Sequence, residues 1–333
     1  MSIMMNLYGR HILVTGGAGF IGSHLTEALV AHNRVTVYDN FSSSVIDQCY
    51  LGNLGNVRVI SGDILDKNKL ERAMKGIDIV FHLAVACVRM SLAKPAFVHD
   101  VNATGTLAAL LAAKKNCVKL FIYISSSEIY GTLESRKIKE SHRINPTTVY
   151  GMSKYIGELY AKHFNDHEGL QTMVVRPFNT YGQRSHFEGV YGEVVQRFVV
   201  RALNGKQPII FGSGRQTRDF TYVTDTVKGI ILAAGNDKLV GDTINIARGQ
   251  EVSILDIAKT ICKIAGLPFQ PIMKQPRPND VVRHFADISY AKQVLNFKPE
   301  VTIKHGLREY VAWIRKTYPD AKQLLSNIPD INL

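Results

Sequence analysis

The stretch that decides the fold is HILVTGGAGFIGSHLTEALV, residues 11–30. It begins with a run of apolar residues that predicts a buried β-strand, and it ends with apolar residues at helical spacing. Gly16, Gly19 and Gly22 lie between them with the spacing G-x-x-G-x-x-G. Glycine is needed where a backbone turns sharply and approaches a pyrophosphate, which the N–H groups of the following helix then bind. The stretch therefore predicts a strand, a glycine loop and a helix that together hold a dinucleotide.

A second strand-like run, RVTVYDN at 34–40, carries an acid that indicates which dinucleotide binds. Asp39 follows Gly22 by 17 residues, close to the position of the acid that hydrogen-bonds the adenosine ribose hydroxyls. A carboxylate there would repel a 2′-phosphate, so the predicted cofactor is NAD rather than NADP. Asp63, which ends the third strand-like run, could reach the adenine ring.

The rest of the first 180 residues repeats the alternation of strand and helix. This pattern predicts an α/β fold with a Rossmann-type doubly wound parallel sheet and helices on both faces. The strand-like runs are HILVTG, RVTVYDN, VRVISGD, DIVFHLA, KLFIYISS and QTMVVRPFN. His82 lies in the fourth run and is interpreted as a packed core histidine, and Leu83 and Ala84 follow where the backbone passes beneath the cofactor.

Beyond about residue 182 the pattern loosens. PIIFG, DFTYVTD and DTINIA are short strand-like pieces, GQRSHFEGVYGEV is predicted to be a loop, and the proline-interrupted QPRPNDVVRHF is predicted to contain no regular element. We expect a smaller mixed α/β lobe here. The expected organisation is an NAD-binding domain at 8–180, to which segments near 215–250 return, and a lobe at 181–333 that mainly binds substrate.

The composition limits the other classes of function. The formal net charge is +12, but no run of Lys or Arg exceeds two residues, so a role in nucleic-acid binding is not expected. No apolar run approaches the roughly 20 residues that span a bilayer, and no signal peptide is expected. Four scattered cysteines form no C-x-x-C pair, which predicts neither a metal site nor disulfides, and favours the cytoplasm.

Three further residues point to oxidation chemistry. Tyr150 and Lys154 share one face of a predicted helix, because they are four positions apart. A lysine beside a phenol stabilises the phenolate and lowers its pKa. Such a phenolate can remove a hydroxyl proton while hydride leaves the same carbon for nicotinamide. The serine turn ISSSEIYG, residues 124–131, precedes Tyr150 and places Ser126 at the end of a predicted strand.

The order of these motifs resembles a known family. TGGAGFIGSHL, HLA, ISSSEIYG, YGMSK, RPFNTYG, RDFTYVTD and RPND followed by FAD resemble the serial motifs of extended short-chain dehydrogenases/reductases. Within these, the chain is similar to the nucleotide-sugar epimerase/dehydratase family and to UDP-glucose 4-epimerase-like enzymes. The resemblance spans roughly residues 10 to 300. It implies a nucleotide-diphosphate sugar as substrate, a UDP-sugar by preference, and NAD as cofactor.

The resemblance also implies the roles of individual residues. Ser126 would hydrogen-bond the sugar hydroxyl, Tyr150 would be the base, and Lys154 would bind the nicotinamide ribose and tune the tyrosine. The residues expected to contact the cofactor are Gly16, Gly19, Phe20, Ile21, Gly22, Asp39, Asn40, Asp63, Ile64, Leu83, Ala84, Tyr150, Lys154 and Pro177. Those expected to contact the substrate are Arg89, Ser126, Asn179, Phe211, Arg218, Arg277 and Asp280, with the last two arginines forming a diphosphate clamp.

Glu128 leaves the reaction open. The family oxidises its sugar, usually at C4, and a 4-epimerase then returns the hydride to the other face. A glutamate two places after the catalytic hydroxyl also occurs in 4,6-dehydratases and in decarboxylases of glucuronates, where it lies near C5. Ser127 departs from the best-known dehydratase pattern, which has aspartate there, and serine at 126 is common in epimerases. A 4-epimerase is favoured, and the dehydratase, the UDP-glucuronate decarboxylase or 4-epimerase and a non-catalytic NAD-binding regulator remain as alternatives.

Two further expectations concern surfaces and charge. Arg89, Arg184 and His186 could supply a cation to a sugar carboxylate, although a loop or phosphate contact is the favoured interpretation for each. The family commonly forms homodimers through two helices, which here correspond to about 97–115 and 150–167. In the first of these helices the expected contact residues are Leu107, Leu110 and Leu111, although these also suit a helix that faces the core.

Overall fold

A computed structural model describes residues 7–132, 137–186, 193–276, 281–320 and 322–325. Its centre is a seven-stranded sheet in the order β11-β6-β5-β4-β1-β2-β3, and every neighbouring pair is parallel. This confirms the predicted Rossmann-type sheet. The strands are β1 (His11–Thr15), β2 (Arg34–Asp39), β3 (Val57–Ser61), β4 (Ile79–His82), β5 (Leu120–Ile124), β6 (Thr172–Pro177) and β11 (Thr243–Ile246).

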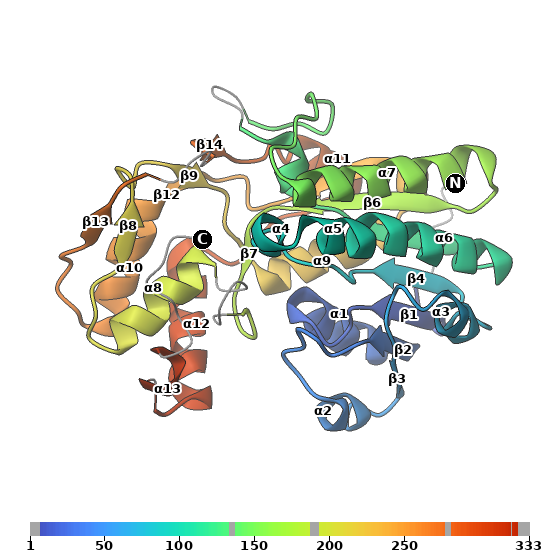
Figure 1. Ribbon diagram of the computed structural model, residues 1–333, viewed down its shortest axis with the longest axis horizontal. Coiled ribbons are helices and arrows are strands. Elements are labelled where there is room, and N and C mark those ends of the chain that lie inside the picture. The colour runs from blue at the N-terminus through green and yellow to red at the C-terminus, as the bar shows by residue number, and fades with distance from the viewer. Residues whose placement is uncertain (1–6, 133–136, 187–192, 277–280, 321, 326–333) are drawn as a thin grey trace.

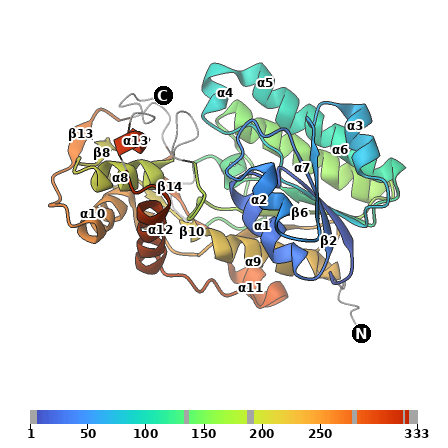
Figure 2. The same ribbon diagram turned by 90° about the horizontal axis from the view of Figure 1, so that it is seen from below.

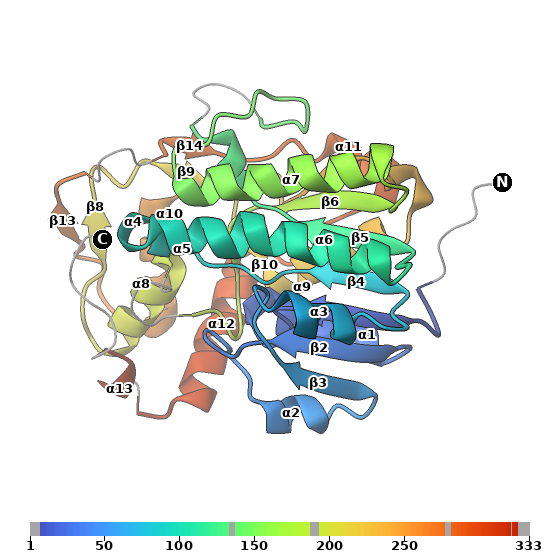
Figure 3. The ribbon, with the colours of Figure 1, turned by 45° about the vertical axis from the view of Figure 1, so that its right-hand side comes forward.

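Helices cover both faces of this sheet (Figure 1). One layer holds α3 (Lys67–Ala73), α5 (Pro95–His99), a π-helical turn η1 (Asp100–Thr104), α6 (Gly105–Lys115) and α7 (Val149–His167). Figure 3 shows α5 and α6 following one another along one line, with α7 running beside them in this layer. The other layer holds α1 (Phe20–Val30), α9 (Val223–Ala234) and α11 (Ser289–Leu295), while α2 (Gln48–Gly52) lies beside β3.

The central strands are apolar on both faces because helices cover both faces. Every residue of β4 and β5 is buried, and β1 is buried from Ile12 to Thr15. A strand of this kind appears in the sequence as a continuous apolar run rather than as an alternating pattern. His82 lies in β4 and is fully buried, and its two ring nitrogens contact the hydroxyls of Thr15 and Thr106. Burial lowers its pKa to about 3, so it is a neutral core histidine, as predicted.

A second lobe lies beside the sheet and holds most of the chain after residue 193 (Figure 2). Its helices are α8 (Val194–Leu203), α10 (Ile254–Ala265), α12 (Ile303–Thr317) and α13 (Lys322–Leu325). Short strands form three small sheets: β10 (Thr221–Tyr222) with β7 (Thr180–Tyr181), β13 (Ile272–Lys274) with β8 (Ile209–Phe211), and β9 (Thr217–Arg218) with β12 (Val252–Ser253) and β14 (Arg283–His284). Elsewhere in the chain, short helical turns follow β4, β5 and α9. They are α4 (Met90–Ala93), η2 (Ser127–Tyr130) and η4 (Asp237–Leu239).

One prediction for this lobe was wrong in part. The segment QPRPNDVVRHF was expected to contain no regular element, but Arg283 and His284 near its end form β14, which pairs with β9. The strand lies beyond the prolines, so its backbone N–H groups remain available for the ladder. Within the described residues, no helix is both long enough and apolar enough to cross a bilayer.

The expected dimer residues divide between core and surface. Leu110 is fully buried in the core between α6 and the sheet, so it cannot supply a contact to a second subunit as expected. Leu107 packs against the same core, whereas Leu111 is 53% exposed. Leu110 and Leu111 are successive residues, which point in different directions on a helix, so Leu110 faces the core and Leu111 is exposed, while Leu107 is partly buried.

Candidate active site

The glycine loop between β1 and α1 forms one end of a cleft. Gly16 has a φ of 70°, which a residue with a side chain rarely adopts, and an added Cβ would lie 2.8 Å from the backbone nitrogen of Ala84. At Gly22 an added Cβ would lie 2.0 Å from the carbonyl oxygen of Gly16. The loop can therefore pack against the helix and against the strand end only because these positions are glycine. This close packing keeps the N-terminus of α1 at the cleft.

Replacement of Gly22 by alanine should therefore disrupt the loop. The methyl group would overlap a backbone oxygen that has no room to move, so we expect the affinity for NAD to fall at least about tenfold and the protein to unfold at a lower temperature. Equilibrium dialysis against NAD and a thermal unfolding curve measure both effects.

Gly52→Ala is the matched control. This glycine lies in α2, and an added Cβ meets no atom of the described structure within 4 Å. Alanine should therefore be neutral or slightly stabilising there. Equal NAD affinity for the Gly22→Ala variant and the unmodified protein would contradict the assignment of the loop.

The cleft that begins at this loop has a volume of about 710 Å³. It is lined by residues from both lobes, and it brings together the described residues that were predicted to contact cofactor or substrate, except Arg184, one of the three cations suggested for a sugar carboxylate. Arg277 and Asp280 lie outside the described residues. The lining residues with predicted roles are Gly16, Gly19, Phe20, Ile21, Gly22, Asp39, Asn40, Asp63, Ile64, Leu83, Ala84, Arg89, Ser126, Glu128, Tyr150, Lys154, Pro177, Asn179, Phe211 and Arg218.

The acids at the ends of β2 and β3 complete the part of the cleft that fits a dinucleotide. Asp39 accepts hydrogen bonds from the backbone N–H groups of Ala18, in the glycine loop, and of Phe41. Burial raises the pKa of its carboxyl, and these two hydrogen bonds act in the opposite direction. Asn40 donates its side-chain amide to Asp63 at 2.9 Å. Together with the glycine loop, this pair of strand ends has the shape and the acceptors that an adenosine ribose requires.

The serine turn follows β5 and faces the same cleft. Ser126 is the N-cap of η2, and its hydroxyl accepts the backbone N–H of Glu128 at 3.2 Å. His284 of β14 contacts the carbonyl oxygen of Ser127 at 3.0 Å, so a residue of the second lobe holds this turn. Burial lowers the pKa of His284 to about 4, which makes it a neutral hydrogen-bond partner. The position of Ser126 thus depends on both lobes.

Tyr150 and Lys154 lie in the first turns of α7. Thr148 caps this helix by accepting the backbone N–H of Gly151. Lys154 is buried, its ammonium group donates to the carbonyl oxygen of Ile124 at 2.6 Å, and it lies 4.4 Å from the centre of the Tyr123 ring. Burial lowers the pKa of Lys154 to about 7. The lysine is therefore fixed at the end of β5, beside the serine turn.

The pKa of Tyr150 differs from the expectation. Burial of the phenol raises its pKa, and the negative charge of Glu128 raises it further, while a hydrogen bond with Ser126 opposes the rise. Burial thus outweighs the lowering of this pKa that was expected from Lys154. A positive charge brought in by the oxidised nicotinamide would favour the phenolate in this buried site.

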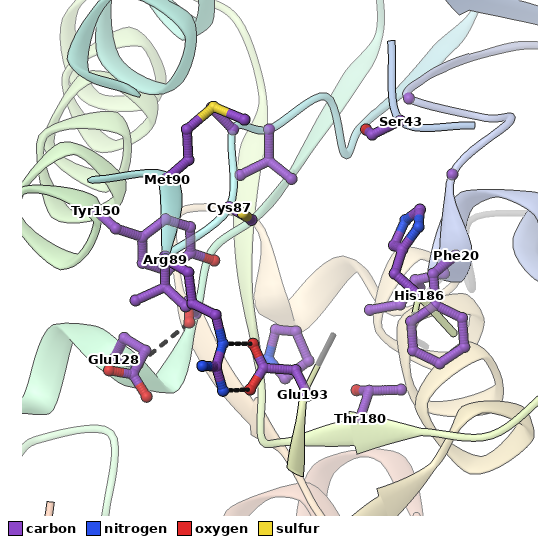
Figure 4. Close-up of a pocket in the computed structure, with 18 of the residues that line it drawn as sticks. Phe20, Ser43, Cys87, Arg89, Met90, Glu128, Tyr150, Thr180, His186 and Glu193 are labelled. Carbon is purple, nitrogen blue, oxygen red and sulfur yellow. Dashed lines mark hydrogen bonds and ion pairs between the residues drawn. The ribbon is translucent and has the colours of Figure 1, made fainter. Parts of the chain in front are cut away.

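A charged pair crosses the cleft beside Tyr150 (Figure 4). Arg89 follows β4, and Glu193 stands at the start of α8 in the second lobe. The guanidinium donates to both carboxylate oxygens, with Nε at 3.5 Å from Oε1 and Nη2 at 3.3 Å from Oε2. The sequence indicated Arg89 but gave no signal for Glu193, because its partner is 104 residues away.

Two other predicted cations take different positions. Arg184 does not line the cleft: it pairs with Glu27 of α1, with Nη1 at 3.0 Å from Oε1, and also contacts His24. Arg184 is therefore not placed to contact a sugar in the cleft. His186 does line the cleft, and burial lowers the pKa of its imidazole.

The residues at the far end of the cleft could hold the rest of a nucleotide-sugar. Asn179 has a φ of 24°, and its side-chain nitrogen is buried with no hydrogen-bond partner within the described part of the chain. A buried donor without a partner is costly, and an oxygen atom of a ligand would satisfy it. Phe211 ends β8, and Arg218 donates to the carbonyl oxygen of Val281 at 2.5 Å.

Comparison with known proteins places this cleft in context. The family model described as "NAD dependent epimerase/dehydratase family" matches residues 12–247. A putative UDP-glucose 4-epimerase of Methanocaldococcus jannaschii is 36% identical over 311 residues, which cover 91% of this chain and 98% of the relative. A UDP-N-acetyl-alpha-D-glucosaminuronate decarboxylase of Bacillus cytotoxicus is 34% identical, covering 93% of this chain and 99% of its own. The matching relatives also include dTDP-glucose 4,6-dehydratases.

A solved structure resembles the whole molecule. The UDP-glucuronic acid 4-epimerase of Bacillus cereus, in complex with UDP-glucuronic acid and NAD, superposes with a TM-score of 0.85 at 32% identity. The match covers 92% of this chain and 100% of the other.

Proposed function

Because the chain belongs to the NAD-dependent epimerase/dehydratase family, within the extended short-chain dehydrogenases/reductases, we propose that it is a nucleotide-sugar 4-epimerase. Its cofactor is NAD, as the sequence predicts. The observation that supports the proposal best is the single cleft in which the glycine loop, Ser126, Tyr150 and Lys154 meet. A UDP-sugar is the proposed substrate, since relatives from this family are named for such substrates.

In the proposed mechanism the sugar is oxidised to a transient 4-keto-sugar. Ser126 hydrogen-bonds the C4 hydroxyl, and Tyr150 removes its proton as general base. The glycine loop and Asp39 would hold NAD, whose nicotinamide would accept the hydride from C4 and supply it again for the return step. Lys154 holds a buried positive charge near Tyr150, and its carbonyl contact at the end of β5 keeps it in place. After the keto-sugar has rotated, Tyr150 gives the proton back to the oxygen at C4.

The product mass tests this proposal directly. The purified protein is incubated with UDP-, dTDP-, GDP- and CDP-sugars, and the products are followed by mass spectrometry. An isomer of unchanged mass supports a 4-epimerase. Loss of water would replace the proposal by a dehydratase, and loss of carbon dioxide would replace it by a decarboxylase.

One observation favours the 4,6-dehydratase as a second candidate. Glu128 lines the cleft, and its charge is close enough to raise the pKa of Tyr150. A carboxylate in this position could remove a proton from C5 of a keto-sugar, which a 4,6-dehydratase requires. The relatives that match this chain include a putative 4-epimerase and 4,6-dehydratases.

Glu128→Gln separates the two reactions. Under the proposed epimerisation, we expect turnover to stay within about fivefold of that of the unmodified protein, because glutamine keeps the size of the side chain and no step uses the carboxylate as a base. Under a dehydratase mechanism the same change should reduce turnover by about 10²-fold or more. Turnover is measured as product formed per minute at saturating substrate. A large loss together with an unchanged product mass would contradict the proposed mechanism.

We also propose that the protein is a homodimer that works in the cytoplasm. The surface of α5, α6 and α7 exposes four large apolar side chains, Phe97, Leu111, Met152 and Leu159, which lie on helices that pack side by side. An exposed apolar patch on packed helices is typical of a helical dimer interface. Leu111 was one of the three leucines expected at this contact, whereas Leu110 is buried in the core. All four cysteines are free thiols, which suits a reducing compartment.

A further inference from the structure

The ion pair between Arg89 and Glu193 has no part in the proposed mechanism, although it lies in the same cleft as Tyr150. The two residues come from different lobes, and Figure 4 shows the Arg89 side chain between Tyr150 and Glu193. The two contacts run in parallel from one side of the guanidinium to the two carboxylate oxygens. This fork geometry fixes the direction of both side chains.

The environment of the pair makes its charges significant. The Arg89 side chain is only 9% exposed, so its guanidinium is largely shielded from water. The Glu193 side chain is 50% exposed and stands at the N-terminus of α8, where a negative charge is stabilised by the helix dipole. The negative charge of Glu193 raises the pKa of Tyr150, and so does the negative charge of Glu128. Two carboxylates therefore already act on the phenol.

A carboxylate on the sugar would add a third negative charge at this place. In a uronate the carboxylate is attached to C5, next to the carbon C4 whose hydroxyl Tyr150 is proposed to deprotonate. The positive charge of Arg89 is already balanced by Glu193, so a sugar carboxylate would have to share one guanidinium with the carboxylate of Glu193 and would be repelled by it. A sugar with a hydroxymethyl group or an acetamido group can bind without disturbing the pair. The ion pair thus makes binding of a uronate less favourable than binding of a neutral sugar.

We propose that the Arg89–Glu193 pair is a specificity determinant, and that it selects nucleotide-sugars with an uncharged sugar and rejects uronates. Glu193 supplies the repulsive element, and Arg89 holds it in place. This inference rests on the proposed function of the cleft and narrows its substrate class to neutral hexoses and N-acetylhexosamines. It also makes the decarboxylase the less favoured of the alternative reactions, since a decarboxylase must bind a uronate.

The test compares neutral and acidic substrates on the holoenzyme. The value of kcat/KM for UDP-glucose and UDP-N-acetylglucosamine is divided by that for UDP-glucuronate, in the unmodified protein and in Glu193→Gln. The unmodified protein is expected to prefer the neutral sugars, and the ratio should fall about tenfold or more in the variant, mainly because uronate turnover rises. Because the loss of Glu193 removes charge repulsion, the change should be smaller at high salt.

Two further variants serve as controls for this test. Glu193→Ser removes the charge but keeps a side chain that can cap α8, so it should change the kcat/KM ratio as Glu193→Gln does. Agreement between the two variants would show that the change comes from the lost charge and not from a destabilised start of α8. Glu300→Gln is the matched control, because it removes one charge from a surface ion pair with Lys228. This control should leave the ratio unchanged.

Binding is measured in parallel, by competition of each nucleotide-sugar against a fluorescent UDP analogue. If no substrate is isomerised, the proposed function fails, and the affinity ratio still decides the inference. A preference of the unmodified protein for the uronate, or an unchanged ratio in both Glu193 variants, would overturn the inference even if epimerisation of neutral sugars is found.

Discussion

Replacement of Tyr150 by phenylalanine is expected to reduce turnover by about 10²–10⁴-fold and to leave the affinity for NAD within about twofold. The change removes one oxygen atom and keeps the ring, so the packing of α7 against the cleft is preserved. The loss of turnover follows from the loss of the group that would remove the C4 hydroxyl proton. Ser126 remains in this variant, but its hydroxyl is too weak a base to replace a phenolate.

Both measurements are needed, because together they distinguish catalysis from structure. Turnover is followed by product mass, and NAD affinity by quenching of protein fluorescence. Tyr160→Phe is the matched control, since it makes the same change further along α7 in a ring that packs against the core. Unchanged turnover in Tyr150→Phe would refute the assigned mechanism and favour the non-catalytic regulator. A joint loss of turnover and NAD binding would instead indicate a structural fault.

The second large effect is expected away from the cleft, at a buried ion pair. Arg176 of β6 donates to both carboxylate oxygens of Glu158 of α7, at 2.9 and 2.6 Å, and each side chain is only 6% exposed. Arg176 also donates to the hydroxyl of Tyr130 at 2.6 Å. Glu158→Leu should therefore lower the free energy of unfolding by about 3–5 kcal/mol, because it leaves a buried cation without its partner.

A double-mutant cycle tests the origin of this loss. Glu158→Leu, Arg176→Met and the combined variant are unfolded in urea at the same NAD concentration, since bound cofactor adds to stability. The combined variant should be more stable than Glu158→Leu alone, because it leaves no uncompensated charge in the core. Glu300→Gln on the surface should have a much smaller effect. Strictly additive losses in the cycle would contradict the interpretation.

The sheet could be predicted from sequence because its signals are local. Each central strand is a short apolar run, and the glycine loop joins the first strand to its helix within one continuous stretch. A parallel sheet covered on both faces leaves this mark directly in the sequence. The same holds for Tyr150 and Lys154, whose spacing of four already places them on one face of α7.

The charged contacts of the cleft could not be predicted, because their partners are distant in sequence. Arg89 pairs with a residue 104 positions away, and Arg184 with one 157 positions away. In the sequence each arginine has several possible roles, and only the folded chain selects one. The raised pKa of Tyr150 has the same origin, since burial depends on the whole cleft and spacing alone suggested the opposite direction.

The seventh strand has a consequence for how the protein is made. β6 ends at Pro177, but its outer neighbour β11 is not complete until Ile246, roughly 70 residues later in the chain. During synthesis at about 5–20 residues per second, the backbone edge of β6 is therefore left open for several seconds after it leaves the ribosome. An unpaired edge strand invites pairing with another nascent chain. The sheet thus depends on late-emerging residues to close it, and this interval is when the protein is most exposed to aggregation and most in need of chaperones.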